Sequence, residues 1–264
     1  SFKDVVIMAV LQSDFLNFAS LKMTDKGSVR GQSITWTKNE IPALKEIKSG
    51  DKGEIKFSIN LQAFQDDDLG KKLEVNSYAQ YSINNQAVKQ ADNKSNVIKN
   101  LINSDLSLSE KILYFNEDNV PVGSGPLPPK VGEKTSFKVY WVVRNNLHEL
   151  SDVKVVFNLP ANINFDEKTY TNVGSLNYDE NARQVVWEIG RLPVSVYRTD
   201  AEFNVSVVPS ENDYDKILVI SPGSVIEATD TETNSIITKK TAAKTTKLED
   251  DDIVNLNNSS GRVQ

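Results

Sequence analysis

Two halves of this chain carry the same series of sequence patterns in the same order, and this internal repeat restricts the fold more than any single motif. The stretch KDVVIMAVLQS at residues 3–13 aligns with SDVKVVFNLPA at residues 151–161. The aligned pairs are Asp4 with Asp152, Gly27 with Gly174, Trp36 with Trp187 and Glu54 with Glu202, at offsets between 147 and 151 residues. The offset changes only where loops are expected, so we infer two copies of one module.

Alternation of apolar and polar residues with a period of two dominates the chain. Runs of this kind occur at residues 135–145, 153–160, 183–190 and 201–209, each bounded by Asn, Asp, Gly or Pro. Such runs are typical of strands with one face in a core and the other in water. In the first run the core-facing set is predicted to be Thr135, Phe137, Val139, Trp141 and Val143. The chain is therefore predicted to be all-β and built of antiparallel sandwiches.

The domain limits are predicted from changes in composition. Residues 1–118 form a first sandwich, and residues 119–130, rich in Pro and Gly, form a linker with little to bury. Residues 131–256 form a second sandwich, followed by a polar, flexible tail at 257–264. The best window for a helix, residues 95–111, runs on into the alternating stretch SLSEKILYF, so a short helix there is the weaker prediction.

The two copies differ at their starts. The second copy has an alternating segment, VGEKTSFKVYWVVRNN, ahead of its SDVKVVF strand, whereas only Ser1 and Phe2 precede the matching KDVVI strand. The first copy is therefore expected to lack its opening one or two strands. Either those strands lie upstream in a longer chain, which we favour, or another chain supplies them by strand pairing.

Bulk composition excludes several functional classes. The net charge is −6 with no basic stripe, which argues against binding to a nucleic-acid backbone. The absence of cysteine excludes disulfides, thiol catalysis and cysteine-based metal sites. The sequence has no apolar run of the roughly 18 residues that a membrane span needs, so no membrane contact is expected in this segment.

The single histidine, His148, is the only residue that could serve a Ser-His-Asp triad or an imidazole-based zinc site. Zinc sites of that kind need several imidazoles or thiolates, so zinc is excluded. His148 lies in the polar stretch RNNLHELSD between two strand-like runs. We predict a histidine on a surface turn with no catalytic role, and no enzymatic activity.

Large aromatic residues are predicted to be structural. Trp36, Trp141 and Trp187 lie within alternating strands, where an indole fills the space between two sheets about 10 Å apart. The alternative, that the tryptophans are platforms on which sugars stack, is less favoured in that context. Tyr140 lies on the predicted outer face beside Trp141 and is the better candidate for an exposed aromatic ring.

Acidic clusters are the remaining candidates for chemistry. Calcium takes six to eight oxygen ligands, and Glu117, Asp118, Asp230 and Glu232 are the weak candidates for such a site. The spacing of a dedicated calcium loop is absent, and solvated loops are the simpler interpretation. Asp66–Asp68 is predicted to be a hairpin loop. A glycosidase carboxylate pair is disfavoured because the acids lie in turns without an aromatic cleft.

An ordered set of motifs runs through residues 127–209. PPKVGEKTSFKVYWVVRNN is followed by LSDVKVVFNLPANINF, GSLNYDENARQVVWEIGRLP and AEFNVSVVPS. This set resembles the bacterial "conserved repeat" immunoglobulin-like domain of cell-surface proteins. The resemblance implies two tandem immunoglobulin-like sandwiches, an extracellular setting and no catalytic residues. The first copy matches less well, since it has Leu11-Gln12 where the second has Leu159-Pro160.

Together these observations predict a non-enzymatic structural module of a bacterial cell-surface protein, acting as stalk, surface layer or adhesion scaffold. Its partners would be other surface proteins or components of the cell envelope, and no cofactor is expected apart from the calcium candidates. Two alternatives stay open: an adhesin head that binds carbohydrate or protein, and a fibre subunit that polymerises by strand donation. A covalent cross-link between a Lys and an Asn or Asp is also left open.

Overall fold

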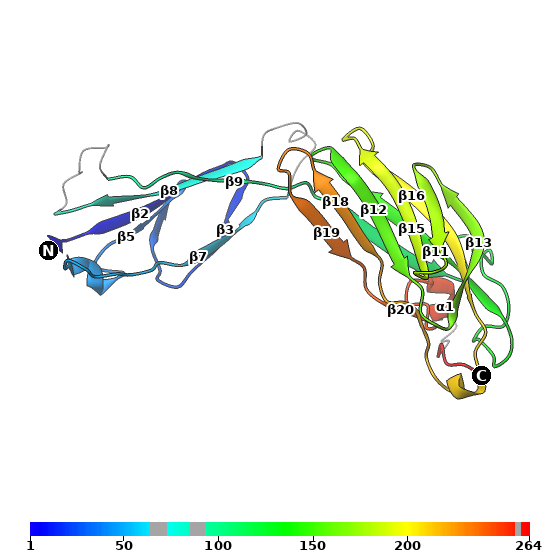
Figure 1. Ribbon diagram of the computed structural model, residues 1–264. Coiled ribbons are helices and arrows are strands. Elements are labelled where there is room, and N and C mark those ends of the chain that lie inside the picture. The colour runs from blue at the N-terminus through cyan, green and yellow to red at the C-terminus, as the bar shows by residue number, and fades with distance from the viewer. Residues whose placement is uncertain (64–72, 85–92, 257–259) are drawn as a thin grey trace. The chain divides into compact units, whose positions relative to one another are not determined.

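The chain divides into two compact units. The computed structural model describes residues 1–63, 73–84, 93–256 and 260–264, and Asp66–Asp68 lie outside them. The units are Ser1–Ile102 and Asn103–Gln264, and each is described here by itself (Figure 1).

The second unit is a sandwich of two antiparallel sheets (Figure 1). The first sheet has the order β10 (Ser107–Leu113), β11 (Thr135–Arg144), β16 (Arg198–Val207), β13 (Ile163–Thr171). The second has the order β14 (Ser175–Asp179), β15 (Gln184–Leu192), β12 (Leu150–Asn158), β18 (Val225–Asp230), β19 (Ile236–Lys240). This is the four-plus-three order of an immunoglobulin-like sandwich with β14 and β15 added at one edge. The predicted all-β, immunoglobulin-like fold is confirmed.

A continuous apolar core joins the two sheets. The inward residues of β11 are those that the alternation predicts, and each of them is fully buried. The indole of Trp141 stacks on that of Trp187, with ring centroids 6.2 Å apart and planes 8° apart. The ring of Phe203 meets Trp141 edge-on at 4.8 Å. Such offset and edge contacts between large aromatic rings fill the space between the sheets and stabilise the packing.

The Pro- and Gly-rich segment at 119–130 is part of the second unit, so the linker predicted there is wrong. Strand β10, which precedes it, pairs with β11, which follows it, from Ser107 opposite Arg144 to Leu113 opposite Lys138. The segment is therefore the connection between two neighbouring strands. Polar groups of the segment form hydrogen bonds within the unit, for example where Ser124 and Ser136 bond through both backbone and hydroxyl groups. Composition alone does not separate such a connection from an inter-domain linker.

The predicted flexible tail also differs from the structure. Residues 257–259 lie outside the described part, but Val263 is buried. The backbone of Gln264 accepts a hydrogen bond from Val131 N–H at 2.8 Å and donates one to the Pro129 carbonyl at 2.9 Å. Before the tail, the short helix α1 (Asp252–Leu256) buries Val254. The end of the chain is thus fastened to the sandwich although its composition is polar.

The first unit consists of one larger sheet and small two-stranded sheets. The larger sheet has the order β4 (Ser28–Arg30), β5 (Ser33–Trp36), β2 (Val6–Gln12), β8 (Glu74–Ser82), β9 (Ile98–Leu101). The small sheets pair β3 (Leu16–Met23) with β7 (Phe57–Leu61) and β1 (Phe2–Lys3) with β6 (Glu46–Ile47). The window at 95–111 holds β9 and the start of β10 in place of a helix.

The strand orders of the two units correspond element by element. The order β4-β5-β2-β8-β9 matches β14-β15-β12-β18-β19, and the pair β3-β7 matches β13-β16. Among the described residues of the first unit, no strands take the places of β10 and β11. As a result, the side chains of the first unit that align with the inward residues of β16 are less buried than those residues. Phe203, Val205 and Val207 are fully buried, whereas Ile55, Phe57 and Ile59 are only partly buried.

Each unit fixes its tryptophan in the same way. The indole N–H of Trp187 donates to the carbonyl of Val173 at 2.8 Å, and that of Trp36 donates to the carbonyl of Asp25, also at 2.8 Å. Val173 directly precedes Gly174-Ser175, and Asp25 is separated from Gly27-Ser28 by one residue. A glycine is required at Gly174, because its φ is +74° and a Cβ atom would lie 2.1 Å from a backbone oxygen of β15. The repeated Gly-Ser and Trp motifs therefore belong to one local structure, a turn beside which a backbone carbonyl accepts the indole N–H of the tryptophan.

Candidate functional site

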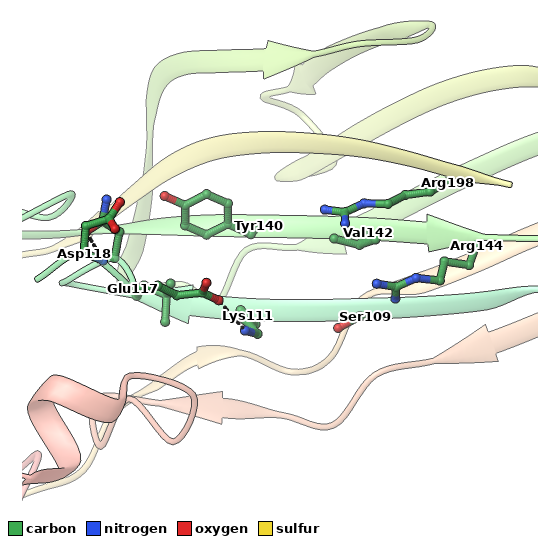
Figure 2. Close-up of a pocket in the computed structure, with 10 residues that line it drawn as sticks. Ser109, Lys111, Glu117, Asp118, Tyr140, Val142, Arg144 and Arg198 are labelled. Carbon is green, nitrogen blue, oxygen red and sulfur yellow. Dashed lines mark hydrogen bonds and ion pairs between the residues drawn. The ribbon is translucent and has the colours of Figure 1, made fainter. Parts of the chain in front are cut away.

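An open pocket of about 480 Å³ lies on the water-facing side of the first sheet of the second unit (Figure 2). Its walls come from β10, the loop after β10, β11 and the first residue of β16. The side chains that determine its chemistry are Lys111, Glu117, Tyr140, Val142, Arg144 and Arg198.

Strand register brings these side chains to one face. Because Trp141 and Val143 point into the core, their neighbours Tyr140, Val142 and Arg144 point outward. Lys111 on β10 is paired with Tyr140. The structure therefore places Tyr140, the predicted exposed aromatic residue, half-buried in the pocket wall.

Two arginines lie directly opposite each other at one end of the pocket. Arg144 on β11 pairs in register with Arg198 on β16. Like charges in this position disfavour the sheet by roughly 0.2–1 kcal/mol. Arg198 has a loose ion pair with Asp200, Nε to Oδ1 at 3.6 Å, whereas Arg144 has no ion-pair partner in the described part of the chain. This end of the pocket therefore carries an excess of positive charge.

The other end of the pocket has mixed charge. Lys111 Nζ lies 3.4 Å from Glu117 Oε1, and both side chains are largely exposed. Burial raises the pKa of the Tyr140 hydroxyl, and nearby Lys138 opposes this without reversing it. The phenol is thus uncharged at neutral pH, and its ring presents an amphipathic surface beside the pocket.

The acidic residues predicted as calcium ligands do not come together. Glu117 and Asp118 line the pocket, whereas Asp230 and Glu232 lie at the end of β18. Within the described residues, no group of three or more His, Asp or Glu side chains is placed to hold a metal ion. Glu232 is exposed, and both oxygens of Asp230 accept hydrogen bonds. The calcium site has no support from this geometry.

His148 is buried, so its predicted position on a surface turn is wrong. Its side chain is 7% exposed, and Nδ1 lies 2.9 Å from Oδ2 of the fully buried Asp230. The same oxygen accepts the backbone N–H of Ser104 at 2.7 Å. The polar stretch around His148 thus folds inward because Asp230 and the segment entering the second unit offer it partners.

This cluster is not a nucleophilic triad. The hydroxyl of Ser104 accepts the backbone N–H of His148 at 3.0 Å and donates to Asn145 Oδ1, so it does not bond to the imidazole. Burial alone would raise the pKa of the Asp230 carboxyl group, but its hydrogen bonds outweigh burial and hold the pKa below the ordinary value. The cluster fixes the entry of the chain into the sandwich.

All three tryptophans are buried, in positions that suit core plugs. Trp36 is 1% exposed, and Trp141 and Trp187 are fully buried.

The pattern of the sequence did not reveal the pairing of Arg144 with Arg198, since the two residues are 54 positions apart and only the register of β11 with β16 joins them. It also did not reveal Glu110, a buried acid that accepts the indole N–H of Trp141 at 3.1 Å.

Comparison with known proteins gives weak structural likenesses. No family model matches the chain, and no curated protein matches it. The C-terminal domain of the Streptococcus pyogenes antigen I/II-family protein AspA is similar over 92% of this chain and 84% of its own, with 13% identity and a TM-score of 0.37.

Two pilins are similar at the same level. The major pilin subunit of Bacillus cereus, BcpA, matches 93% of this chain and 64% of its own, with 7% identity and a TM-score of 0.38. The major pilin SpaD of Corynebacterium diphtheriae matches 92% of this chain and 61% of its own, with 8% identity and a TM-score of 0.36. Because these scores are below 0.5, the fold assignment rests on the strand order of this chain. No helix in the described part of the chain is long and apolar enough to cross a membrane.

Proposed function

We propose that this chain is a non-enzymatic structural module of a bacterial cell-surface protein, which carries tension from one sandwich to the next outside the cell. The observation that supports this most is the path of the chain through the second unit, whose first residues lie at one end of the sandwich and whose residue Gln264 lies at the other. The repeat and the resemblance of residues 127–209 to surface-protein domains support the extracellular setting. Other surface proteins and envelope components are the proposed partners.

The positions of these two segments follow from strand register. The chain enters at Ser104, just before Ser107, which is paired with Arg144 at the end of β11. The C-terminal residues pack at the other end of β11, where the backbone of Gln264 bonds to Val131, four residues before β11 begins. Since β11 runs the length of the sandwich, the two points lie at opposite ends of it.

This path puts tension parallel to the strands. Strand β10 lies next to the entry point and bonds to β11 along its whole length. A pull along β10 loads all of these hydrogen bonds together, whereas a pull across the sheet would open them one after another. Lengthwise loading therefore gives a slower unfolding rate under force, which is the quantity that decides mechanical lifetime.

Buried polar contacts fasten both ends. At the entry, Asp230 holds the backbone of Ser104. At the far end of β10, the buried Asp251 accepts the backbone N–H groups of Tyr114 at 2.8 Å and Phe115 at 2.7 Å. Hydrogen bonds to a charged acceptor are stronger than neutral ones, so β10 is held at both of its ends before the ladder itself is loaded.

The test is to stretch the full chain between its termini in a single-molecule instrument. We expect the second unit to unfold at a higher force than the first, because in the described part of the chain β7 pairs with one strand where its counterpart β16 pairs with two. The Asp230→Ala variant should unfold at a lower force, and Glu232→Gln should match the parent. Equal unfolding forces for parent and Asp230→Ala would reject the proposed fastening.

A second candidate function, a fibre subunit that accepts a strand from a neighbouring chain, is favoured by one observation. Among the described residues β7 pairs only with β3, whereas its counterpart β16 pairs with both β13 and β11. Light scattering of the full chain across a wide concentration range tests this candidate. Assembly that an added β11 peptide (residues 132–146) blocks would support strand acceptance, and a monomer at every concentration would reject it.

A further inference from the structure

We propose that the open pocket on the first sheet of the second unit binds an acidic oligosaccharide. Arg144 and Arg198 would hold a sugar carboxylate, and Tyr140 would pack against a sugar ring. This inference goes beyond the proposed mechanical role and does not depend on it, since a tension-bearing sandwich needs no ligand on its outer face.

The first step concerns charge. The whole chain has a net charge of −6, yet two guanidinium groups from directly opposed positions extend toward Val142, one on either side of the β11 ribbon (Figure 2). A guanidinium group presents a planar fork of N–H donors that matches the two oxygens of a carboxylate. Cross-strand partners are only about 5 Å apart at their Cα atoms, so one carboxylate can bond to both arginines. Binding would neutralise charge that the described residues leave uncompensated.

The second step concerns the floor of the pocket. Val142 and Tyr140 precede Arg144 at intervals of two residues along the same face of β11. The Cα atoms of Arg144 and Tyr140 are about 13 Å apart at the rise of a strand. Sugar rings have an apolar face of C–H groups, which packs on an aromatic ring. The arginine side chains cover part of this distance, so a disaccharide with its carboxylate at the arginines can place its second ring on Tyr140 (Figure 2).

The third step separates an acidic sugar from an acidic peptide. The Tyr140 end of the pocket also holds Glu117 and Asp118. Glu117 is paired with Lys111, so this end has no net positive charge to hold further acidic residues of a peptide, whereas both carboxylates can accept hydrogen bonds from hydroxyl groups. A carboxylate at one end and uncharged hydroxyls at the other thus match the lining. The pocket volume of about 480 Å³ lies within the range of roughly 300–1,000 Å³ found for small-molecule sites.

The experiment compares two probes that differ in whether one carboxyl group is charged. Glucuronosyl-galactose, a disaccharide with a single carboxylate, and its methyl ester are titrated into the full chain, with binding followed by calorimetry and by NMR shifts of labelled protein. We expect the acid to bind at least tenfold more tightly than the ester, and to shift the amide signals of Tyr140, Val142 and Arg144. The Arg144→Gln/Arg198→Gln double variant should lose at least tenfold in affinity for the acid and little for the ester.

Two further variants sharpen the test. Tyr140→Leu should weaken both probes by several-fold, because it removes the ring and leaves the charges. Arg191→Gln is the matched control, because Arg191 is an exposed arginine on the opposite sheet, paired with Glu149, and its loss should not change binding. The double arginine variant should unfold at an equal or higher urea concentration than the parent, which shows that any lost binding does not come from unfolding.

Three results would overturn the proposal. The first is equal affinity for acid and ester, and the second is binding that survives the double arginine variant. The third is tighter binding of a Glu-rich peptide than of glucuronosyl-galactose, which would assign the pocket to a protein partner.

Discussion

Replacing Asp230 by Ala should destabilise the second unit strongly. The fully buried carboxylate accepts hydrogen bonds from Ser104 N–H, from the His148 ring and, through its other oxygen, from the backbone at Glu232 and Thr233. In the variant, water can accept hydrogen bonds from the backbone N–H groups of Glu232 and Thr233, which lie in the turn after β18. The donors of Ser104 and His148 are buried and would lose their partner.

The expected loss follows from these two buried donors. Each buried donor left without a partner costs about 1–3 kcal/mol, which gives a total of about 2–6 kcal/mol. Breaking one side of a buried charged pair typically costs about 3–5 kcal/mol, which agrees with this range. We therefore expect the unfolding free energy to fall by about 4 kcal/mol. With a urea dependence of about 2 kcal/mol per molar, the midpoint would move by about 2 M.

Urea unfolding followed by tryptophan fluorescence measures this change. A Trp36→Phe background restricts the signal to Trp141 and Trp187, both in the second unit. Glu232→Gln is the matched control, since this exposed acid lies two residues away, and it should change stability by less than about 0.5 kcal/mol. A loss below about 1 kcal/mol for Asp230→Ala, or a loss equal to the control, would refute the reasoning.

Three other predictions follow from the same contacts. The pKa of Asp230 is lowered in the folded state, so the carboxylate stabilises the fold fully above its unfolded pKa of about 3.9, and this contribution is lost as the pH falls through its folded pKa. Asp230→Asn should therefore lose less stability than the parent between about pH 4 and pH 2. Parallel plots of unfolding free energy against pH for the two proteins would contradict this. Trp141→Phe should cost about 2–4 kcal/mol, since it removes the stack on Trp187 and the indole bond to Glu110, and a urea midpoint within error of the parent would argue against that packing. Millimolar calcium should change the melting temperature by less than about 1 °C relative to EDTA, and a rise of several degrees would reveal a site that the described acids do not form.

Alternation and repeat were sufficient to predict the fold class and the inward face of β11. A period of two decides which face of a strand is apolar, and the sandwich then follows from the need to bury that face. The recurrence of Gly-Ser and Trp was likewise visible in both copies, whereas the hydrogen bond from each indole to a backbone carbonyl near the Gly-Ser turn was not.

What the sequence did not reveal depends on contacts between distant residues. The boundary was misplaced because residues 119–130 resemble a linker in composition, and only the pairing of β10 with β11 shows that they connect two strands of one sheet. The burial of His148 depends on Asp230, 82 positions away. The arginine pair in the candidate pocket depends on the register of β11 with β16, which alternation within either strand does not specify.

The central claim, that the second unit carries tension lengthwise, is tested most directly by changing the direction of the pull. The chain has no cysteine, so pairs of introduced cysteines define the two points of attachment without ambiguity. One pair at Asn103 and Gln264 pulls along the strands, and one pair at Lys111 and Lys239, on β10 and on β19 of the opposite sheet, pulls across them. We predict that the lengthwise pull requires a clearly higher unfolding force at the same loading rate. Equal forces in the two directions, or a higher force for the crosswise pull, would contradict the proposed function.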